Sequence, residues 1–506
     1  MHIRPPATQQ SEQPTASRPR ARGLEHTMKI YAGKLYDPYT LELLPRRVIT
    51  TSAESGLVLD VETYDAADEA SVDFADPAVV DLREATVLPG FVDAHIHLFL
   101  HAYSEVSWED QVTKQSAPER IVRATLHARR TLMAGYTAVR DLGTEGMDDA
   151  DIQLRRLMSG PSPMIPGPRY FCSNRALTTT NTYGLLDWSA SAIGKSSPNA
   201  CTGPKNKTHF NRDGVEGVTG AEVVDGEVEC IKAVRRQIGG GADWIKVYAD
   251  YRPRSRMVDV STPAAQADIA TFNRRELDAI VATAHQLGVK VAAHSAHWNI
   301  NGTAIASGPG FHTVEHGYDM LFDRPDAKHL RVYRGDMPGI KTYWVPTLAA
   351  YYSMSKASPA KWEHCKRVFK HALDRGVEDI ACGGDTGVFN HGENALEMKL
   401  MVQLGADWRK VLRWGTLNGW HCIRSMAWEG EEGTDRQAGV KSLSEDVRLV
   451  GDNEVPFGAV ERGFAADIIA TSGDLEKDFE NAVDSSAILF VMKGGRVYKR
   501  DGKEVV

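Results

Sequence analysis

Hydrophobic and polar positions alternate with different periods along the chain, and these changes divide it into segments. Between residues 28 and 88, short β-like runs such as KIYAGKLYD and RRVITT are separated by turn residues, which is typical of a small β domain. Between residues 89 and 425, apolar runs alternate with helical patterns. That alternation is typical of βα units built around a parallel sheet.

β-like runs return near the end of the chain, where ADIIATSG is followed by AILFVMKGGRVYKRDG with its Gly-Gly turn. A β domain assembled from both chain ends around an α/β core accounts for this order. We therefore expect a small composite β-sandwich made of residues 28–88 and 426–506, and a core of residues 89–425. Residues 1–27 are rich in Pro, Gln, Ser and Arg, so we expect a disordered extension there.

The core contains eight apolar runs that we interpret as strands. Two of the helical patterns between them, ERIVRATLHARRTLMAG and RRELDAIVATAHQLG, end at a glycine, which is a common stop signal. Eight strands followed by helices predict an α/β protein of the (β/α)8 barrel type. A doubly wound open sheet is the alternative, although no GxGxxG turn supports it. The predicted strands are 90–97, 136–142, 168–174, 244–250, 289–295, 312–317, 343–348 and 380–385.

Composition excludes several classes of protein. The net charge of −8 and the lack of a basic stripe argue against a nucleic-acid partner. No apolar run is long enough to span a membrane, and the first 28 residues lack the hydrophobic segment of a secretory signal. The six cysteines are scattered without a CxxC pair, which fits a reducing compartment. We therefore expect a cytoplasmic protein.

Polar residues gather at the strand ends of the core. GFVDAHIHLF places Asp93, His95 and His97 on alternate positions, so a strand would point all three in one direction. Most of the other chemically active residues also end their strands, at the edge where barrel enzymes build their sites. One such residue alone is more often structural, but a convergent set of them predicts a metal site. The set is His95, His97, Lys246, His294, His316 and Asp385.

These motifs resemble those of the amidohydrolase superfamily. PGFVDAHIH is similar to its HxH strand, IKVYAD to the strand with the bridging lysine, and AAHS, VEHG and GGDTG to its later ligand segments. AGYTAVRDLG and HGENALEMKLMVQLG resemble, more narrowly, the imidazolonepropionase-related branch. That branch includes metal-dependent Xaa-Pro and Xaa-Arg dipeptidases and ochratoxin-hydrolysing carboxypeptidases. The resemblance covers nearly the whole chain after the first 27 residues.

The resemblance implies a site for two divalent metal ions. His95 and His97 would bind the first ion, and His294 and His316 would bind the second. CO2 would convert Lys246 into a carbamate that bridges both ions, which agrees with charge because an ammonium group would repel them. Zinc suits nitrogen and oxygen ligands with an open position, although other divalent ions fit the same ligands.

The reaction implied by this site is hydrolysis of an amide. A water that bridges the two ions would lose a proton and attack the carbonyl group, while Asp385, also a weak metal ligand, would carry that proton to the leaving amine. The expected substrate is a dipeptide or an N-acyl amino acid. A cyclic-amide or lactone hydrolase, or a deaminase, on the same barrel is the alternative, and a non-catalytic binding protein is a third. Lys246 counts against mononuclear deaminases, which normally lack it.

Residues around the expected pocket suggest how it holds a substrate. Tyr251 could donate a hydrogen bond to the developing oxyanion, and Arg252 could hold a carboxylate through two hydrogen bonds. A solvated basic loop is the alternative for Arg252, because two more arginines follow closely. His391 is a candidate for the pocket mouth. Asp93 either supports the histidines or is a plain strand-end residue.

One segment departs from the family pattern. After the third strand, related enzymes often carry a Gly-His-Gly-Asp-like loop, whereas this chain has TTTNTYGLLDW and a long irregular stretch to about residue 220. The departure leaves the metal chemistry intact but leaves the substrate open. Arg140 and Asp141, at the end of the second strand, could pair with one another. Related enzymes often assemble further, so the resemblance also implies a homo-oligomer.

Overall fold

The computed structural model describes residues 27–160, 162–180, 182, 220–251, 269–295, 310–318, 341–442 and 453–505. The predicted extension lies outside these residues except for Thr27, which begins the first strand. Arg252 and most of the 175–220 loop also lie outside them. The expectations for those segments therefore stay predictions.

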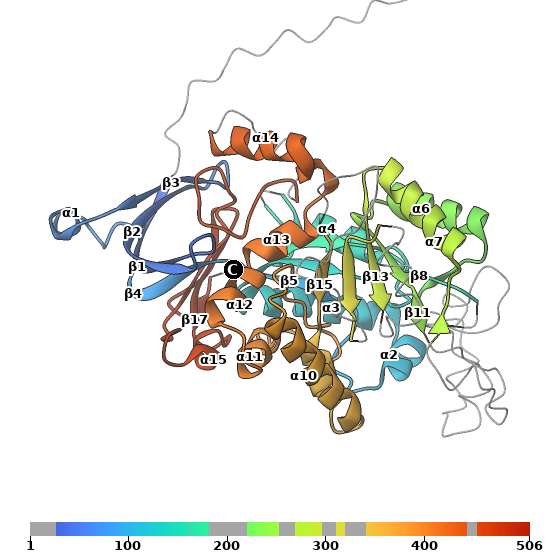
Figure 1. Ribbon diagram of the computed structural model, residues 1–506. Coiled ribbons are helices and arrows are strands. Elements are labelled where there is room, and N and C mark those ends of the chain that lie inside the picture. The colour runs from blue at the N-terminus through green and yellow to red at the C-terminus, as the bar shows by residue number, and fades with distance from the viewer. Residues whose placement is uncertain are drawn as a thin grey trace, which may run out of the picture.

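Strands from both chain ends form one eight-stranded sheet, in the order β19-β18-β17-β16-β4-β1-β2-β3. Its two halves meet where β16 pairs antiparallel with β4, and in Figure 1 the blue and red strands lie together at one end of the molecule. The N-terminal strands are β1 (Thr27–Asp37), β2 (Glu42–Ser52), β3 (Val58–Thr63) and β4 (Val79–Pro89). The C-terminal strands are β16 (Ile468–Thr471), β17 (Ile488–Lys493), β18 (Arg496–Arg500) and β19 (Lys503–Glu504).

The core contains two parallel sheets. One has the order β5-β6-β7 and the other β15-β14-β13-β10-β8-β9. Their strands are mostly buried along their whole length, as expected for parallel strands covered on both faces. The strands are β5 (Phe91–Ile96), β6 (Tyr136–Asp141), β7 (Arg169–Cys172), β8 (Leu177–Thr178), β9 (Glu222–Val223), β10 (Trp244–Tyr248), β13 (Lys290–Ser295), β14 (Thr313–His316) and β15 (Tyr343–Val345). Seven of the eight predicted runs are strands within three residues of the expected bounds; β8 and β9 were not expected.

The eighth predicted strand, 380–385, is not a regular strand. It makes isolated parallel bridges, Ile380 with Trp344 of β15 on one side and Thr386 with Ile96 of β5 on the other. The ladder is interrupted because Gly383 and Gly384 lie there and Asp385 has a positive φ of 58°. The segment nevertheless joins the outer edges of the two parallel sheets. A second backbone contact starts from β7, the other edge strand of the smaller sheet: the Asp243 N–H, just before the interior strand β10, donates to the Cys172 carbonyl at 2.8 Å.

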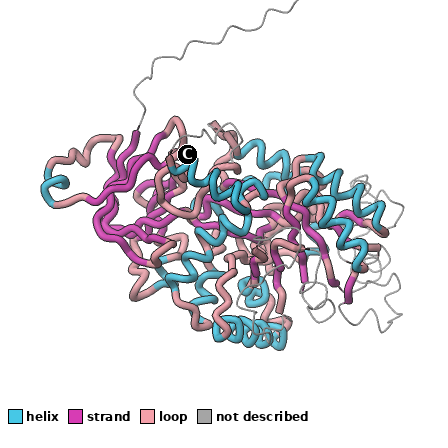
Figure 2. The backbone as a smooth tube through the Cα atoms, turned by 45° about the horizontal axis from the view of Figure 1, so that its top comes forward, coloured by secondary structure: helices cyan, strands magenta, loops and turns pink. Residues whose placement is uncertain are grey.

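Helices surround the parallel strands (Figure 2). The two predicted helices are α3 (Ala117–Met133) and α7 (Arg274–Gln286), and each is followed by the expected glycine with a positive φ, Gly135 at 96° and Gly288 at 73°. The other helices are α1 (Ala66–Ala70), α2 (Trp108–Lys114), α4 (Ala150–Met158), α6 (Glu227–Gly240), α9 (Leu348–Ser353), α10 (Pro359–Asp374), α11 (Leu396–Gln403), α12 (Trp408–Trp414), α13 (Leu417–Ile423), α14 (Gly430–Lys441) and α15 (Phe479–Ala482).

The region after residue 425 begins differently from the sequence prediction. We expected only β structure there, but α14 precedes the C-terminal strands. A buried ion pair fixes the β sheet to the core, with Arg169 Nε 2.7 Å from Asp467 Oδ2. Across the described part of the chain, no helix has the length and apolar character needed to cross a membrane. The five cysteines within it are buried and free of disulfides.

Candidate active site

A cavity of about 550 Å³ opens at the C-terminal ends of the parallel strands. All six residues that the sequence predicts as metal ligands line it. They come from the ends of β5, β10, β13 and β14 and from the bridging segment 380–386. The other lining residues are Leu100, Tyr103, Tyr248, Asp250, Tyr251, Tyr351, Met354, Ser358, Lys361 and Val388.

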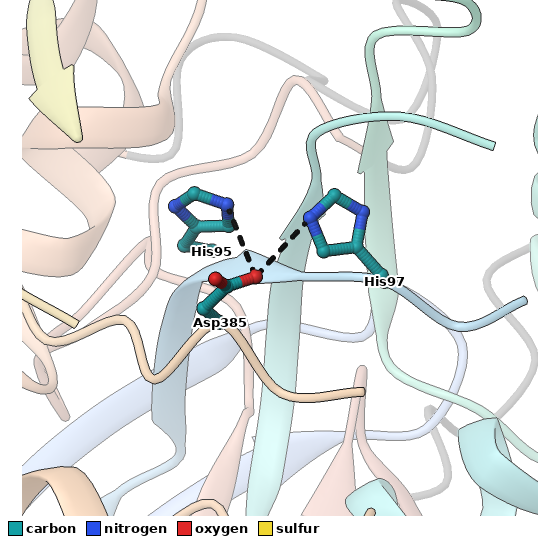
Figure 3. A group of neighbouring side chains, drawn as sticks. All are labelled: His95, His97 and Asp385. Carbon is teal, nitrogen blue, oxygen red and sulfur yellow. Dashed lines mark ion pairs between the residues drawn. The ribbon is translucent and has the colours of Figure 1, made fainter. Parts of the chain in front are cut away.

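Three of the predicted ligands form the tightest group, shown in Figure 3. The Nε2 atoms of His95 and His97 lie 3.5 Å and 3.3 Å from Asp385 Oδ1. One ligand atom from each residue lies within 4.8 Å of the others. Such spacing allows one metal ion to be held by all three side chains.

The remaining two histidines lie beside this group. The ring centroids of His294 and His316 are 4.4 Å apart, and His316 is 5.3 Å from His95. Parallel pairing of β13 with β14 places these two strand ends next to each other. The four imidazoles therefore surround one volume, as the sequence pattern predicts.

Contacts behind His95 determine its tautomer. Its Nδ1 lies 2.9 Å from Glu315 Oε2, and Arg140 Nη2 donates to the other oxygen of Glu315 at 2.8 Å. Both carboxylate and guanidinium are fully buried. Because a carboxylate accepts the proton on Nδ1, the Nε2 of His95 keeps its lone pair toward the cavity.

His97 and His316 are oriented in the same way. His97 Nδ1 lies 3.0 Å from the Gly143 carbonyl oxygen, and His316 Nδ1 lies 2.7 Å from Thr347 Oγ1. A carbonyl can only accept, so His97 presents Nε2 to Asp385. Three of the four histidines are thus prepared as Nε2 donors for a metal ion.

Backbone strain also concentrates here. His316, Thr347 and Asp385 have φ values of 69°, 55° and 58°, a left-handed region that costs free energy for residues other than glycine. Such conformations persist only where surrounding contacts hold them. His316 and Asp385 line the cavity, and Thr347 places its hydroxyl at His316 Nδ1.

Lys246 lies buried beneath the histidines, with 1% of its surface exposed. Its Nζ has no hydrogen-bond partner among the described residues. Burial lowers the pKa of this amine to about 8, which the carboxylates Glu315 and Asp385 only partly offset. Burying an amine without a hydrogen-bond partner costs folding free energy. This suggests that Nζ binds a further group in the working enzyme.

Proton affinities differ sharply among the cluster. Burial acts to lower the pKa of His97, but the hydrogen bond and charge of Asp385 outweigh it and raise that pKa to about 9. Burial lowers the pKa of His95 to about 4 and that of His316 to about 3. Burial alone would raise the pKa of Asp385, yet the neighbouring histidines bring it well below its ordinary value. Asp385 is thus an anion among imidazoles.

Asp93 binds a backbone N–H and two polar side chains rather than an imidazole. It accepts hydrogen bonds from the His95 N–H at 3.1 Å, from Thr386 Oγ1 at 2.9 Å and from Asn394 Nδ2 at 2.7 Å. It therefore fastens β5 to the segment that carries Asp385. The sequence left open whether Asp93 supports the histidines or is a plain strand-end residue. These contacts favour a supporting role.

The expected pair of Arg140 with Asp141 does not form. Neighbouring residues of a strand point to opposite faces, so Arg140 reaches Glu315 while Asp141 accepts from Tyr170 OH at 2.6 Å. Glu315 itself was missed by the sequence reasoning, although it directly precedes His316. Its position on a buried parallel strand is the signal that could have identified it, because a buried carboxylate needs a partner.

The predicted substrate residues are placed differently from one another. Tyr251 lines the cavity, and its ring centroid is 5.5 Å from that of His294. His391 lines a separate, smaller cavity of about 150 Å³, where it stacks on His127 at 4.1 Å. Its Nε2 binds the Leu100 carbonyl, so the structure gives no support for His391 at the pocket mouth. Tyr351 and Lys361, which the sequence reasoning missed, line the main cavity instead.

Comparison with known proteins decides the family. The profile of the amidohydrolase family matches residues 86–425. The chain belongs to the amidohydrolase family. It is 25% identical to the ochratoxinase of Aspergillus niger over 430 residues, covering 83% of this chain and 77% of that enzyme.

Solved amidohydrolase-family structures share the fold. A Xaa-Pro dipeptidase with methionine bound in its active site matches with a TM-score of 0.67 and 24% identity, covering 94% of this chain and all of that one. The A. niger ochratoxinase structure matches with a TM-score of 0.65 and 20% identity, covering 94% and 96%. The predicted superfamily is therefore confirmed, and this amidohydrolase is a hydrolase of amide bonds.

Proposed function

We propose that this amidohydrolase is a binuclear metal-dependent enzyme that cleaves the amide bond of a dipeptide or an N-acyl amino acid. The observation that carries the proposal is the convergence of four histidines, one lysine and one aspartate on a single cavity. The names of the similar proteins, an ochratoxinase and a Xaa-Pro dipeptidase, agree with a substrate of this class.

The residues present fit two divalent ions. His95, His97 and Asp385 would hold the first ion, and His294 and His316 would hold the second. The fixed Nδ1–H groups of three histidines leave Nε2 as the metal-binding atom, and N/O ligands favour zinc. When bound, such ions activate a water molecule and polarise a carbonyl group.

Lys246, converted to a carbamate, would be a ligand shared by the two proposed metal ions. Its neutral amine would attack the carbon of CO2. A nitrogen–carbon bond would form, one carbon–oxygen π pair would become the negative charge of the carbamate, and the proton lost from nitrogen would pass to water. A pKa of about 8 makes the neutral amine accessible near neutral pH. The resulting anion would explain why Nζ has no hydrogen-bond partner among the described residues, and it would offer two oxygens as metal ligands.

Asp385 and Tyr251 would act on the substrate. Asp385 holds a proton taken from the attacking water and transfers it to the leaving amine, so that the carbon–nitrogen bond breaks with a neutral product. Tyr251 lines the cavity, from where its hydroxyl would donate to the carbonyl oxygen as charge develops. Arg252, the next residue, would hold the substrate carboxylate.

We also propose that the parallel strands form one closed (β/α)8 barrel. The 380–386 segment bridges β15 and β5, and a backbone hydrogen bond joins Asp243 to β7. These contacts link β15 to β5 at one edge and β7 to the residue before β10 on the other side. The domain division at residues 28–88, 89–425 and 426–506, the cytoplasmic location and the homo-oligomer remain proposals of the same kind.

A substrate screen tests the function. The zinc-loaded enzyme is offered N-acyl amino acids and dipeptides, each as a free acid and as its C-terminal amide. We expect the free acids to be hydrolysed faster, because the amides lack the carboxylate that the mouth would bind. Equal turnover of both forms would favour the alternative, a cyclic-amide or lactone hydrolase.

A further inference from the structure

Glu397 is a buried carboxylate, 1% exposed, that does not line the catalytic cavity. It lies on α11, within the segment HGENALEMKLMVQLG. Its two oxygens accept hydrogen bonds from the Leu348 N–H at 3.1 Å and the Ala349 N–H at 2.7 Å. These are the first N–H groups of α9, which have no partner within the helix itself. Glu397 therefore caps a helix from a distant part of the chain.

Thr347 occupies the position that normally caps such a helix, but its side chain makes no capping bond. Its hydroxyl donates to the Pro346 carbonyl at 2.7 Å, so its oxygen is left to accept from His316 Nδ1–H, also at 2.7 Å. The hydroxyl can turn toward His316 because Thr347 has a φ of 55°. A β-branched residue rarely adopts that conformation without external support.

We propose that Glu397 is a positioning residue for His316, acting through the α9 N-terminus and Thr347. The inference rests on the proposed function, since it concerns the second metal-binding pair. With Glu397 in place, the Leu348 and Ala349 N–H groups are satisfied and the turn before them keeps its left-handed form. Thr347 then fixes the His316 proton on Nδ1, which leaves Nε2 to a metal ion.

Without the Glu397 carboxylate, we expect each of these contacts to be lost in turn. A glutamine at position 397 can accept one of the two N–H groups, but its NH2 group would face the other donor. The turn then relaxes toward negative φ, Thr347 Oγ1 moves away and His316 no longer has a fixed tautomer. Glu397 does not line the cavity, and no hydrogen bond joins it to His316 among the described residues. Because the charge of Asp385 also acts on Glu397, the Thr347→Val variant, which leaves every charge in place, tests the path through Thr347.

The first test uses metal-free protein labelled with ¹⁵N in its histidines. In the wild type, NMR should show a slowly exchanging Nδ1–H signal for His316, assigned by its absence in His316→Asn. We expect Glu397→Gln and Thr347→Val to lose that signal, and Thr347→Ser, which keeps the hydroxyl, to retain it. Glu393→Gln is the matched control, because Glu393 belongs to the same segment but is exposed.

The second test measures binding of Zn²⁺ by equilibrium dialysis. We expect Glu397→Gln and Thr347→Val to lower the affinity for Zn²⁺ at one of the two sites by about 10- to 100-fold. This is the range seen when a metal-binding histidine loses the hydrogen-bond partner of its other ring nitrogen. A folded Glu397→Gln protein with the wild-type His316 signal overturns the inference. If Glu397→Gln does not fold, an unchanged signal in Thr347→Val overturns it equally. A wild type that shows the His316 signal but binds no zinc would overturn the proposed function instead.

Discussion

The floor and the mouth of the cavity are built differently. On the floor, His95 and Lys246 are 1% exposed and His316 is 4% exposed, and buried contacts fix the side chains that surround them. At the mouth, Lys361 is exposed on α10 and Tyr251 is only half-buried. Strand ends carry the floor, whereas Lys361 lies in the first turn of α10 and Tyr251 lies on β11 (Asp250–Tyr251), a two-residue strand that pairs with β12 (Ile269–Ala270) beside the main sheet. Rigid strand ends suit the chemistry common to a family, and connecting segments suit the choice of substrate.

The largest effect should come from Lys246→Ala, because Lys246 would connect both metal-binding halves of the floor. We expect nearly all activity to be lost, because the variant could not form the proposed carbamate and would lose the metal ions that activate water. Steady-state assays with zinc present measure this loss. Added short carboxylates such as acetate should restore part of it. A Lys246→Ala enzyme with more than a tenth of wild-type activity would contradict the bridging role.

Asp385→Asn separates proton transfer from metal binding on the same floor. We expect kcat to fall by roughly 10²–10⁴-fold, with metal content largely intact because the histidines remain. Kinetics and elemental analysis of one preparation give both values. Near-normal kcat would mean that another group carries the proton.

Glu315→Gln tests whether the floor depends on buried contacts behind the ligands. Glu315 fixes the Nδ1 proton of His95 and is paired with Arg140. We expect the affinity for one metal ion to fall by about 10- to 100-fold, measured by competition with a chelator. Glu378→Gln, a partly exposed carboxylate that pairs with Lys410, is the control. Equal affinities in the two variants would show that the floor does not need this contact.

The smallest effect should appear at the mouth. No described carboxylate pairs with Lys361, which therefore has its charge available for an anionic substrate. We expect Lys361→Met, like Arg252→Ala, to raise KM for free-acid substrates by about 3- to 10-fold with kcat little changed. Lys370→Met, on the opposite side of α10, should leave KM as it is. If KM rose equally for C-terminally amidated substrates, Lys361 would not bind the substrate carboxylate.

The same contrast explains what the sequence could predict. His95, His97 and Lys246 were predictable because local alternation and apolar context place them on strand ends. Glu315 and Glu397 were not, since their partners lie 220 and 49 residues away in the chain and only tertiary packing brings them together.

Two further expectations compare differently with the structure, and the reasons are equally local. The predicted strand 380–385 fails as a ladder because two glycines and the left-handed Asp385 interrupt it. His391 follows that segment closely in sequence, yet the chain turns and buries it against His127. A role for His391 in substrate binding therefore stays a prediction.

Metal titration tests the central claim most directly. The enzyme is stripped with a chelator, and amide hydrolysis is measured as Zn²⁺ is added back in the presence of bicarbonate. The account predicts negligible activity in the stripped enzyme and a rise that saturates at two ions per chain. Full activity without metal, or saturation at one ion, would contradict it.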